Sequence, residues 1–588
     1  MGPIDIRESI GGVNRPRLAG LLAFIAVALV HFLTVPRTIW EYDENLFALG
    51  VEHYEPLAHH PPPPGYPLYM ACAKLVALFI GGDAFRALTI LSIITLIAGL
   101  ITWYLAFREI TGDAMIGILG SALLYLCPAL LISGVLPQSD SGALALFGLA
   151  TYACARRSPQ FAAIACAACI GWRQQFAVAI VPMFFIALIF FKDWRDRARA
   201  VGVFAVTCVL WLIPIVIATD GPEGFFRLIF GQAAYYAAHD ATLSRSGYST
   251  GLLVSRFLAH PWGPKWLAFP LLLIAVAGVV MLLVRRNKLM WPLATGCGIY
   301  LVFAYMTMDP ADAVRYAIPA LPAIALFAAV PLIKLALIGV MIAIAYAAGT
   351  IGYTMPVLHA RATSDSPPVA AAKYMQANVP KNTIVLYDLP LRPHADNLLR
   401  QWKSMRIDAG LAKFGGDPSV PMVILADGAR GNAPGVTFSW PDTDAYRKLT
   451  RQHYGAVSVI PLPPSGRYHV IEGIGAPERT RSGESWRWIG KRGVLDLPDL
   501  GAAQVRFTFH APGDYPLGEN RIRVRISNRE FTTTIKKGGT AELTVPIPRG
   551  DVRVTIEADQ SFVPANVPGA LNRDQRTLSV MLTGVQQM

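Results

Sequence analysis

Charged residues are scarce in this chain. Asp, Glu, Lys and Arg make up 15% of its 588 residues, against roughly a quarter of a typical soluble protein. The mean hydropathy is +0.42, and the apolar residues gather in long runs between residue 17 and about residue 355. Each run approaches the roughly 20 residues that a helix needs to cross a bilayer. We therefore expect a polytopic membrane protein with a large extramembrane part after residue 356.

Cysteine is also scarce, and none follows Cys297. All seven cysteines lie in or beside apolar segments, so no disulfide framework is indicated in the extramembrane part. Cys166 and Cys169 have CxxC spacing, but small apolar packing residues are the better interpretation. The sequence contains no glycine-rich phosphate loop and no His/Cys cluster with metal-ligand spacing. It therefore indicates no required cofactor and no metal site, and it leaves a divalent cation open.

The net charge of +13 does not indicate a nucleic-acid-binding protein. Much of the surplus lies in short loops between apolar runs, where Lys and Arg mark the cytoplasmic side of a membrane protein. The basic clusters include KDWRDRAR (192–199) and RRNK (285–288). Membrane lipids, and not nucleic acid, are the partners that this distribution predicts.

The orientation of the chain depends on the apolar stretch 66–82. If this stretch does not span, every dense basic cluster faces the cytoplasm, as the positive-inside rule requires, and if it spans, all of them face outside. We therefore predict an in-plane or re-entrant helix at 66–82, an exterior C-terminal part and about 11 transmembrane helices. The predicted spans are 17–36, 86–107, 114–134, 141–155, 160–171, 174–191, 200–219, 266–284, 289–307, 315–331 and 335–355.

Two motifs stand out in the first exterior loop. The stretch WEYDENLF (40–47) places Asp43 and Glu44 at the outer end of the first span. Ionisable groups at membrane depth are costly and indicate function, and a carboxylate there suits a general base toward a hydroxyl group. Interfacial capping or a salt bridge is the structural alternative. The stretch HHPPPPGYPLY (59–69) is a stiff proline arm that would aim polar residues, unless it is a plain connector.

Other exterior loops add polar residues on the same side. They are PQSDS (137–141), GWRQQF (171–176) and MDPADAVRYAIP (308–319). Arginine in such loops suits a phosphate, because its planar guanidinium donates paired hydrogen bonds, although a single arginine is often an interfacial anchor. The loop at 220–265 is too long for a tight connector and is interpreted as a lid or acceptor-binding element. The candidate substrate-binding residues are Gln138, Asp140, Arg173, Arg315, Tyr316, His60, Tyr66 and His239.

Taken together, these motifs resemble a known family. An acidic pair after the first span, then HPPxGYP before a non-spanning helix, then an Asp after the third span is similar to the GT-C glycosyltransferases. The nearest branch is that of the protein O-mannosyltransferases and aminoarabinose transferases. The resemblance covers about residues 17–355. It implies a polytopic α-helical fold, a donor sugar on a polyprenyl phosphate, and chemistry at the outer face of the membrane.

The resemblance also implies residue roles. Asp43 takes the place of the inverting catalytic base, with Glu44 as its support or alternative. Asp140 matches the acidic position that orients the acceptor or, in some members, binds a metal. Arg315-Tyr316 matches an RY pair that begins a late span, and Arg173 is a looser match. The chain departs from the pattern in having four prolines after the histidines, which puts a role for His60 in doubt.

The exterior part shows two kinds of pattern. Between 367 and 427, helix signals (367–380 and 391–402) alternate with buried-type strands (383–388 and 422–427), which predicts a small α/β module. From about 480, apolar residues alternate with polar ones, as in RIRVRIS (521–527), which predicts an antiparallel β-sandwich. Trp486 and Trp488 lie on one face of a strand, where they would stack on sugars or pack in a core. The predicted domains are 1–355 (catalytic, transmembrane), 356–475 (α/β module) and 476–588 (β-sandwich).

The prediction for the whole chain is an inverting glycosyltransferase. It would move a sugar from a polyprenyl-phosphate donor to an envelope acceptor, which is a glycan, a lipid or a protein. The absence of cysteine from the exterior part fits a bacterial inner membrane with a periplasmic C-terminal domain. Two other functions stay open: a lipid or glycan transporter or flippase, and a non-catalytic envelope scaffold that binds glycan.

Overall fold

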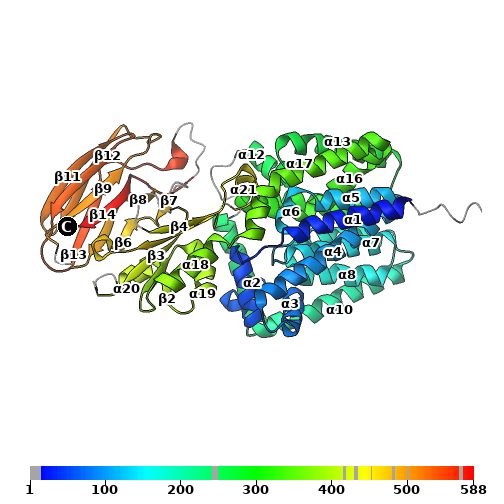
Figure 1. Cartoon of the computed structure of the whole chain (residues 1–588), viewed down its shortest axis with the longest axis horizontal. Coiled ribbons are helices and arrows are strands. Elements are labelled where there is room, and N and C mark those ends of the chain that lie inside the picture. The colour runs from blue at the N-terminus through cyan, green and yellow to red at the C-terminus, as the bar shows by residue number, and fades with distance from the viewer. Residues whose placement is uncertain are drawn as a thin grey trace, which may run out of the picture.

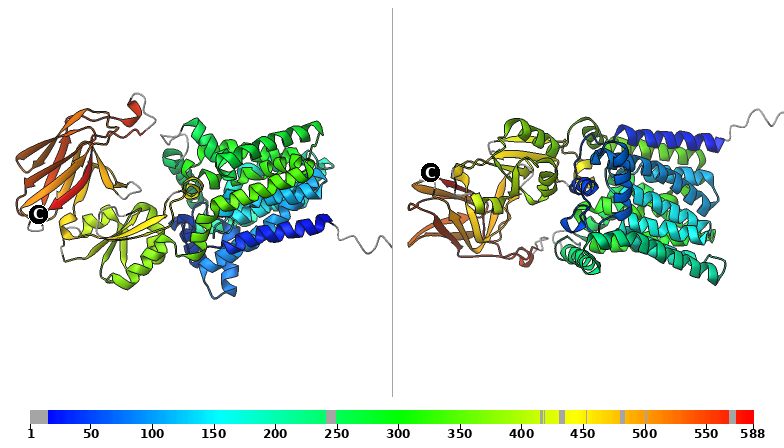
Figure 2. Two further views of the ribbon diagram at one scale, coloured as in Figure 1. Left: turned by 45° about the horizontal axis from the view of Figure 1, so that its top comes forward. Right: turned by 90° about the horizontal axis from the view of Figure 1, so that it is seen from below.

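The molecule is elongated, with a helical bundle at one end and a β-rich domain at the other (Figure 1). A small α/β module lies between them (Figures 1 and 2). The computed structural model describes residues 15–588, apart from 241–248, 415–416, 418, 430–434, 452, 480–483, 500–501 and 568–573. The arrangement agrees with the prediction of a polytopic helical protein that carries a C-terminal extramembrane part.

The bundle is built from apolar helices of unequal length. In the described residues, five helices are long and apolar enough to cross a membrane, or six if the bent pair Pro310–Tyr316 and Ile318–Lys334 is one span. The helices of the bundle are α1 (Arg15–Leu33), α2 (Tyr42–Glu52), α3 (Pro67–Phe79), α4 (Ala84–Thr111), α5 (Ala114–Tyr125), α6 (Pro128–Ser133), α7 (Asp140–Ala155), α8 (Pro159–Trp172), α9 (Ala177–Leu188), α10 (Trp194–Ala218), α11 (Pro222–Tyr235), α12 (Thr250–Val254), α13 (Lys265–Val284), α14 (Met290–Thr307), α15 (Ala313–Tyr316), α16 (Leu321–Lys334) and α17 (Ala336–Thr363).

Every predicted span overlaps a helix, but the number of 11 spans stays a prediction. Several helices are shorter than the roughly 20 residues of a membrane crossing, among them α8 and α9. Proline explains part of this, because it cannot donate the helical hydrogen bond and marks helix starts. Thus α5 and α6 are separated before Pro128, and α8 begins at Pro159. The stretch 66–82 forms only α3, of 13 residues.

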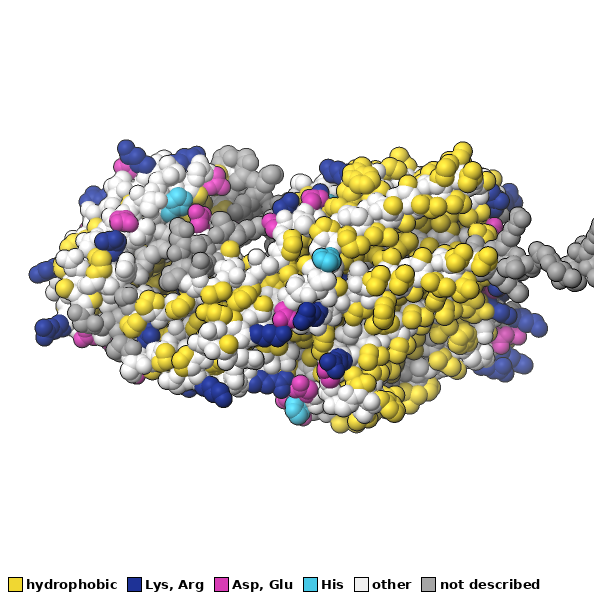
Figure 3. Space-filling view, in the orientation of Figure 1, with side chains coloured by type: hydrophobic (Ala, Val, Ile, Leu, Met, Phe, Trp, Pro, Cys, Tyr) yellow, Lys and Arg dark blue, Asp and Glu magenta, His cyan; other side chains and the backbone are white. Residues whose placement is uncertain are grey.

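The two ends of the bundle differ in their polar groups. Apolar side chains cover its flank, and charged side chains gather at the end furthest from the α/β module (Figure 3), which is the end where α1 begins (Figure 1). At that end Asn287, in the loop after α13, donates to the carbonyl of Ile110 near the end of α4 at 2.8 Å. The basic loops that follow α4 and α13 therefore lie together, as the topology prediction requires. A bundle with this surface is a membrane protein.

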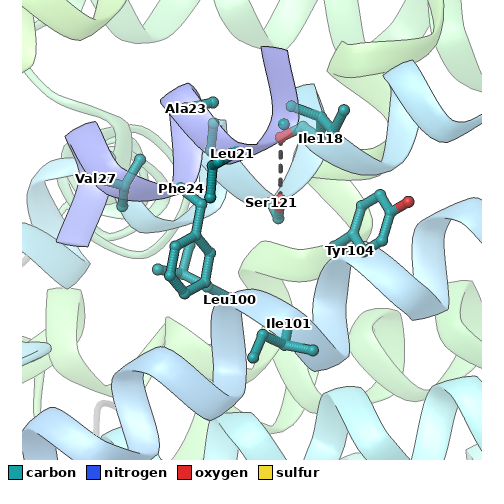
Figure 4. A pocket seen from close by; sticks show the side chains of 11 residues that line it. Leu21, Ala23, Phe24, Val27, Leu100, Ile101, Tyr104, Ile118 and Ser121 are labelled. Carbon is teal, nitrogen blue, oxygen red and sulfur yellow. Dashed lines mark hydrogen bonds between the residues drawn. The ribbon is translucent and has the colours of Figure 1, made fainter. Parts of the chain in front are cut away.

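An apolar cavity of about 330 Å³ lies between α1, α4 and α5 (Figure 4). Phe24, Leu100 and Ile101 line it, and Ser121 turns its hydroxyl to the carbonyl of Ile118 at 3.0 Å. Hydrocarbon side chains offer no acid, base or anion-binding group. The chemistry of this chain therefore has to be sought elsewhere, at the end of the bundle that contacts the α/β module.

The proline arm closes a small hairpin at that end. Glu55 and His60 exchange backbone hydrogen bonds of 2.6 and 3.0 Å, and the hydroxyl of Tyr54 donates to the carbonyl of Gly65. Gly65 has a φ of 104°, a conformation that favours glycine. The arm therefore delivers Tyr66 to the start of α3 in a defined position, and α3 packs against α2, α4 and α8.

The α/β module contains a five-stranded sheet in the order β2-β1-β3-β5-β4. Strands β1, β2 and β3 are parallel, and β5 is antiparallel to both of its neighbours. The two predicted helices and two predicted strands are present as α18, α19, β1 and β3, within a few residues. The elements are α18 (Pro367–Asn378), β1 (Ile384–Tyr387), α19 (Arg392–Leu398), β2 (Lys403–Arg406), α20 (Ile407–Phe414), β3 (Met422–Asp427), β4 (Val436–Ser439), α21 (Asp444–Leu449) and β5 (Ala456–Pro461).

The C-terminal domain is antiparallel and β-rich, with its predicted period-two faces buried. Its strands follow one hydrogen-bonded path, β11-β10-β13-β8-β14-β9-β12, with β6 and β7 also paired to the long β8, instead of two separate sheets. Trp486 and Trp488 are half-buried and alternate with the buried Arg487 and Ile489. The strands are β6 (His469–Ile474), β7 (Glu478–Arg479), β8 (Ser485–Leu497), β9 (Gln504–His510), β10 (Glu519–Ile526), β11 (Arg529–Lys536), β12 (Thr540–Pro546), β13 (Val552–Ala558) and β14 (Val580–Gln587).

The α/β module is docked on the segment that leads into α2. The ring of Trp40 is fully buried and lies 5.0 Å from that of Trp440 and 6.2 Å from that of Tyr446, centre to centre. His394 Nε2 donates to the carbonyl of Trp40 at 2.7 Å. Because aromatic pairs and buried hydrogen bonds resist separation, the module and the start of α2 form one packed unit.

Removal of the Trp440 side chain tests this docking. We expect Trp440→Ala to lower the free energy of unfolding by about 3–5 kcal/mol, the usual cost of truncating a buried tryptophan. Thermal unfolding and limited proteolysis of the purified full chain measure it. Trp194→Ala is the matched control, since that side chain is 71% exposed. Equal behaviour of the two variants would contradict the docking described here.

Candidate active site

The guanidinium group of Arg315 lies at the centre of the candidate site. Its Nη1 donates to Asp43 Oδ2 at 2.8 Å and its Nε donates to Asp140 Oδ2 at 3.0 Å. A third carboxylate, that of Asp312, lies 3.8 Å away. Asp43, Asp140 and Arg315 were predicted from separate exterior loops. They lie on α2, α7 and α15, and the structure brings them into contact.

Arg173 is a second arginine that donates to Asp140. It lies at the end of α8, and its Nη1 donates to Ser139 Oγ at 2.7 Å and to Asp140 Oδ2 at 3.4 Å. Its Nη2 donates to Gln175 Oε1 at 3.2 Å. The side chain of Asp140 is only 3% exposed. Asp140 is therefore enclosed by protein and accepts hydrogen bonds from both arginines.

Asp43 and Glu44 are neighbours in sequence but face different surroundings. The Asp43 side chain is 27% exposed, whereas Glu44 is fully buried. Glu44 Oε2 accepts the backbone N–H of Trp40 at 2.7 Å, which ties the third residue of α2 to the segment before it, as in one half of a capping box. Glu44 is thus held inside the fold, and Asp43 is the more exposed carboxylate of the pair.

The pKa values of the acidic residues at α2 diverge. Burial acts to raise the pKa of Asp43, but the charge and hydrogen bond of Arg315 outweigh it, so this pKa lies below its ordinary value. Burial raises the pKa of Glu44 to about 7, against the opposing backbone hydrogen bond from Trp40. Burial, together with the nearby Asp312 and Glu44, raises the pKa of Glu41 to about 8. At neutral pH Asp43 is therefore ionised, Glu44 is near its midpoint and Glu41 is mostly protonated.

Aromatic side chains border the charged cluster. The guanidinium carbon of Arg173 lies 5.9 Å from the centre of the Tyr66 ring, which packs edge-on against Phe47. Tyr316 is half-buried, and Tyr236 is near enough to act on its charge. Tyr66 and Tyr316 therefore lie beside the charged cluster.

His60 and Gln138 make no side-chain hydrogen bond to this cluster among the described residues. His60 belongs to the hairpin of the proline arm, and the charged groups that act on it are Asp396, Glu55, Arg392 and Arg400. Gln138 is buried at 2% exposure, and its Oε1 has no hydrogen-bond partner in the described part of the chain. The side chain of His239 lies outside the described residues. The predicted long loop at 220–265 is helical where it is described, as α11 and α12 with short turns around them.

Sequence reasoning missed other members of the site. Glu41 precedes Asp43 by two residues in WEYDENLF. Arg451 comes from the α/β module, and its Nη2 donates to Asp309 Oδ2 at 3.1 Å. The position of Glu41 beside the acidic pair was a usable signal. The sequence contains no comparable signal for Arg451, because this residue lies in an ordinary polar stretch far along the chain.

Comparison with known proteins gives one family match. Residues 59–213 match the family described as DolP-mannose mannosyltransferase. The match begins at the proline arm and includes Asp140 and Arg173, and it ends before Arg315. No curated protein matches the chain.

Solved structures also resemble the chain, at low identity. ArnT from Cupriavidus metallidurans, bound to undecaprenyl phosphate, has 14% identity and a TM-score of 0.48 over 75% of this chain and 97% of its own. The oligosaccharyltransferase of Archaeoglobus fulgidus in the apo form has 11% identity and a TM-score of 0.49 over 92% and 96%. The predicted resemblance to membrane glycosyltransferases with lipid-linked donors is confirmed by the family match, for residues 59–213.

Proposed function

We propose that this protein is an inverting glycosyltransferase that uses a polyprenyl-phosphate sugar. The acceptor is a hydroxyl group of an envelope glycan, lipid or protein, and the reaction takes place at the outer face of a bacterial inner membrane, with the C-terminal domains in the periplasm. The family that matches residues 59–213 is named for a lipid-phosphate mannose donor, which favours a hexose such as mannose as the sugar.

The observation that carries this proposal is the state of Asp43. Among Asp43, Glu44 and Asp140, Asp43 combines the largest exposure with a lowered pKa. Arg315 donates to Oδ2, and in the described part of the chain no hydrogen bond is made to Oδ1. A general base must be unprotonated and within reach of the hydroxyl it serves. Asp43 meets both requirements at neutral pH.

The chemistry follows from this geometry. The polyprenyl chain dissolves in the bilayer, so its phosphate lies at the interface and the sugar projects from it. Asp43 takes the proton of the acceptor hydroxyl as that oxygen attacks the anomeric carbon from the face opposite the phosphate. The new glycosidic C–O bond forms, the C–O bond to phosphate breaks, and polyprenyl phosphate leaves with the bonding electron pair. The configuration is inverted, and the arginines stabilise the departing charge.

The first test compares two neighbouring carboxylates. We expect Asp43→Asn to reduce the release of polyprenyl phosphate by at least about 100-fold, because general bases typically contribute factors of 10² to 10⁴. Glu44→Gln should keep most of the activity, because the amide oxygen can still accept from Trp40. Purified protein in nanodiscs is supplied with a panel of polyprenyl-phosphate sugars and membrane extract. Equal release by wild type and Asp43→Asn would remove Asp43 as the base.

The pH dependence of the reaction tests the pairing of Asp43 with Arg315. In the wild type, activity should persist at neutral pH and be lost only as the pH falls through the lowered pKa of Asp43. Arg315→Gln removes the main charge that lowers the pKa of Asp43, while burial still acts to raise it. The pKa of Asp43 therefore rises, and the acidic limb of kcat/KM moves to higher pH. Rates measured from acidic to mildly basic pH decide this. An unmoved limb, with the variant folded, would argue against the pairing.

Arg315 also bears on metal dependence. Its guanidinium lies between Asp43 and Asp140, the carboxylates that would otherwise be available to a divalent cation, and the described residues contain no group of three His, Cys, Asp or Glu side chains arranged for a metal. The residues in this arrangement do not fit a cation. We therefore expect EDTA to leave turnover unchanged. Loss of activity in EDTA with recovery in Mg²⁺ or Mn²⁺ would show that Arg315 moves aside.

A further inference from the structure

Arg451 reaches the membrane domain from the α/β module. It follows α21, and its Nη2 donates to Asp309 Oδ2 at 3.1 Å, just before α15. Asp309 is 1% exposed at its side chain, whereas Arg451 is 28% exposed. One end of this ion pair is therefore buried in the bundle, while the Arg451 side chain is partly exposed.

The charge of Arg451 acts on the candidate site. The charges that act on it most strongly include Asp312 and Tyr316, which lie three residues before and one residue after Arg315. Arg451 also lowers the pKa of Asp43, by less than Arg315 does, whereas burial acts to raise it. Such effects fall off with distance in a partly solvated cluster. Arg451 thus lies within electrostatic reach of Asp43, on the side of the α/β module.

The arginines of the site differ in the hydrogen-bond donors that they have left. Arg173 and Arg315 are 4% and 11% exposed, and each already donates to two or more side chains. A guanidinium carries five N–H donors. Arg451 has one carboxylate partner, and its Nε and the Nη2 of Arg315 are buried without a hydrogen-bond partner among the described residues. These donors suit an anion that enters between Arg315 and Arg451.

We propose that Arg451 binds the phosphate of the polyprenyl-phosphate donor, and that the α/β module is thereby part of the active site. This inference rests on the proposed function. The phosphate gains charge as the sugar leaves, since a diester becomes a monoester of about −1.5 to −2 at neutral pH. A guanidinium at that position stabilises the product and the transition state more than the bound donor.

The competing explanation is that Arg451 and Asp309 form an ion pair that merely docks the module. Two variants separate the explanations. Arg451→Gln and Asp309→Asn both break the pair, so a docking role predicts equal effects. A phosphate-binding role predicts opposite effects, because Asp309→Asn removes the carboxylate that competes with the phosphate for Arg451 and leaves the guanidinium in place.

The experiment uses the full chain in nanodiscs with undecaprenyl phosphate as the probe. Its affinity is measured by native mass spectrometry and, independently, as an inhibition constant for sugar transfer. We expect Arg451→Gln to weaken binding about 10- to 100-fold, as the loss of charge-assisted hydrogen bonds does, and Arg451→Lys to restore part of it. Asp309→Asn should bind as tightly as the wild type or more tightly. Arg447→Gln, on the exposed side of α21, is the matched control.

The outcomes are distinguishable. Equal weakening in Arg451→Gln and Asp309→Asn, or wild-type affinity in Arg451→Gln, would overturn the inference while sugar transfer by the wild type still upheld the proposed function. Thermal unfolding of each variant identifies losses caused by instability. Arg451-dependent binding without transfer of any sugar would support the phosphate site and reject the glycosyltransferase proposal.

Discussion

The bridge that Arg315 makes between Asp43 and Asp140 is the interaction on which the candidate site depends. One guanidinium holds together α2, α7 and α15, and Arg173 completes the pairing of Asp140. Charges removed from water are tolerated only when they are well paired, and breaking such a pair leaves an uncompensated charge. The bridge therefore fixes the position of Asp43 and, at the same time, ties together the ends of helices that are remote in sequence.

The same bridge separates the acidic residues of α2 by function. Asp43 keeps its charge because Arg315 donates to it, whereas Glu41 and Glu44 have raised pKa values because burial is not offset in the same way. Carboxyl groups within four residues of one another thus have different protonation states near neutral pH. Such divergence is what acid–base chemistry at a single site requires.

The α/β module is a structural component of this site. Trp40, which directly precedes the acidic residues, is enclosed by Trp440 and Tyr446 from the module, and its carbonyl accepts from His394. Arg451 reaches in from the same module. The position of Asp43 is accordingly set from two sides, by the membrane helices through Arg315 and by the module through Trp40.

Local sequence determined the apolar helices, the start of α3 after the proline arm, the period-two strands of the C-terminal domain and the candidates Asp43, Asp140, Arg173 and Arg315. These features depend on the polarity and backbone preferences of adjacent residues, which a single sequence displays. Only the tertiary structure decided which charges meet. Arg315 and Asp43 are 272 positions apart, and no local pattern specifies such a pair. The same reason explains why Glu44 turned inward, why His60 stayed outside the cluster, and why Arg451 was not foreseen.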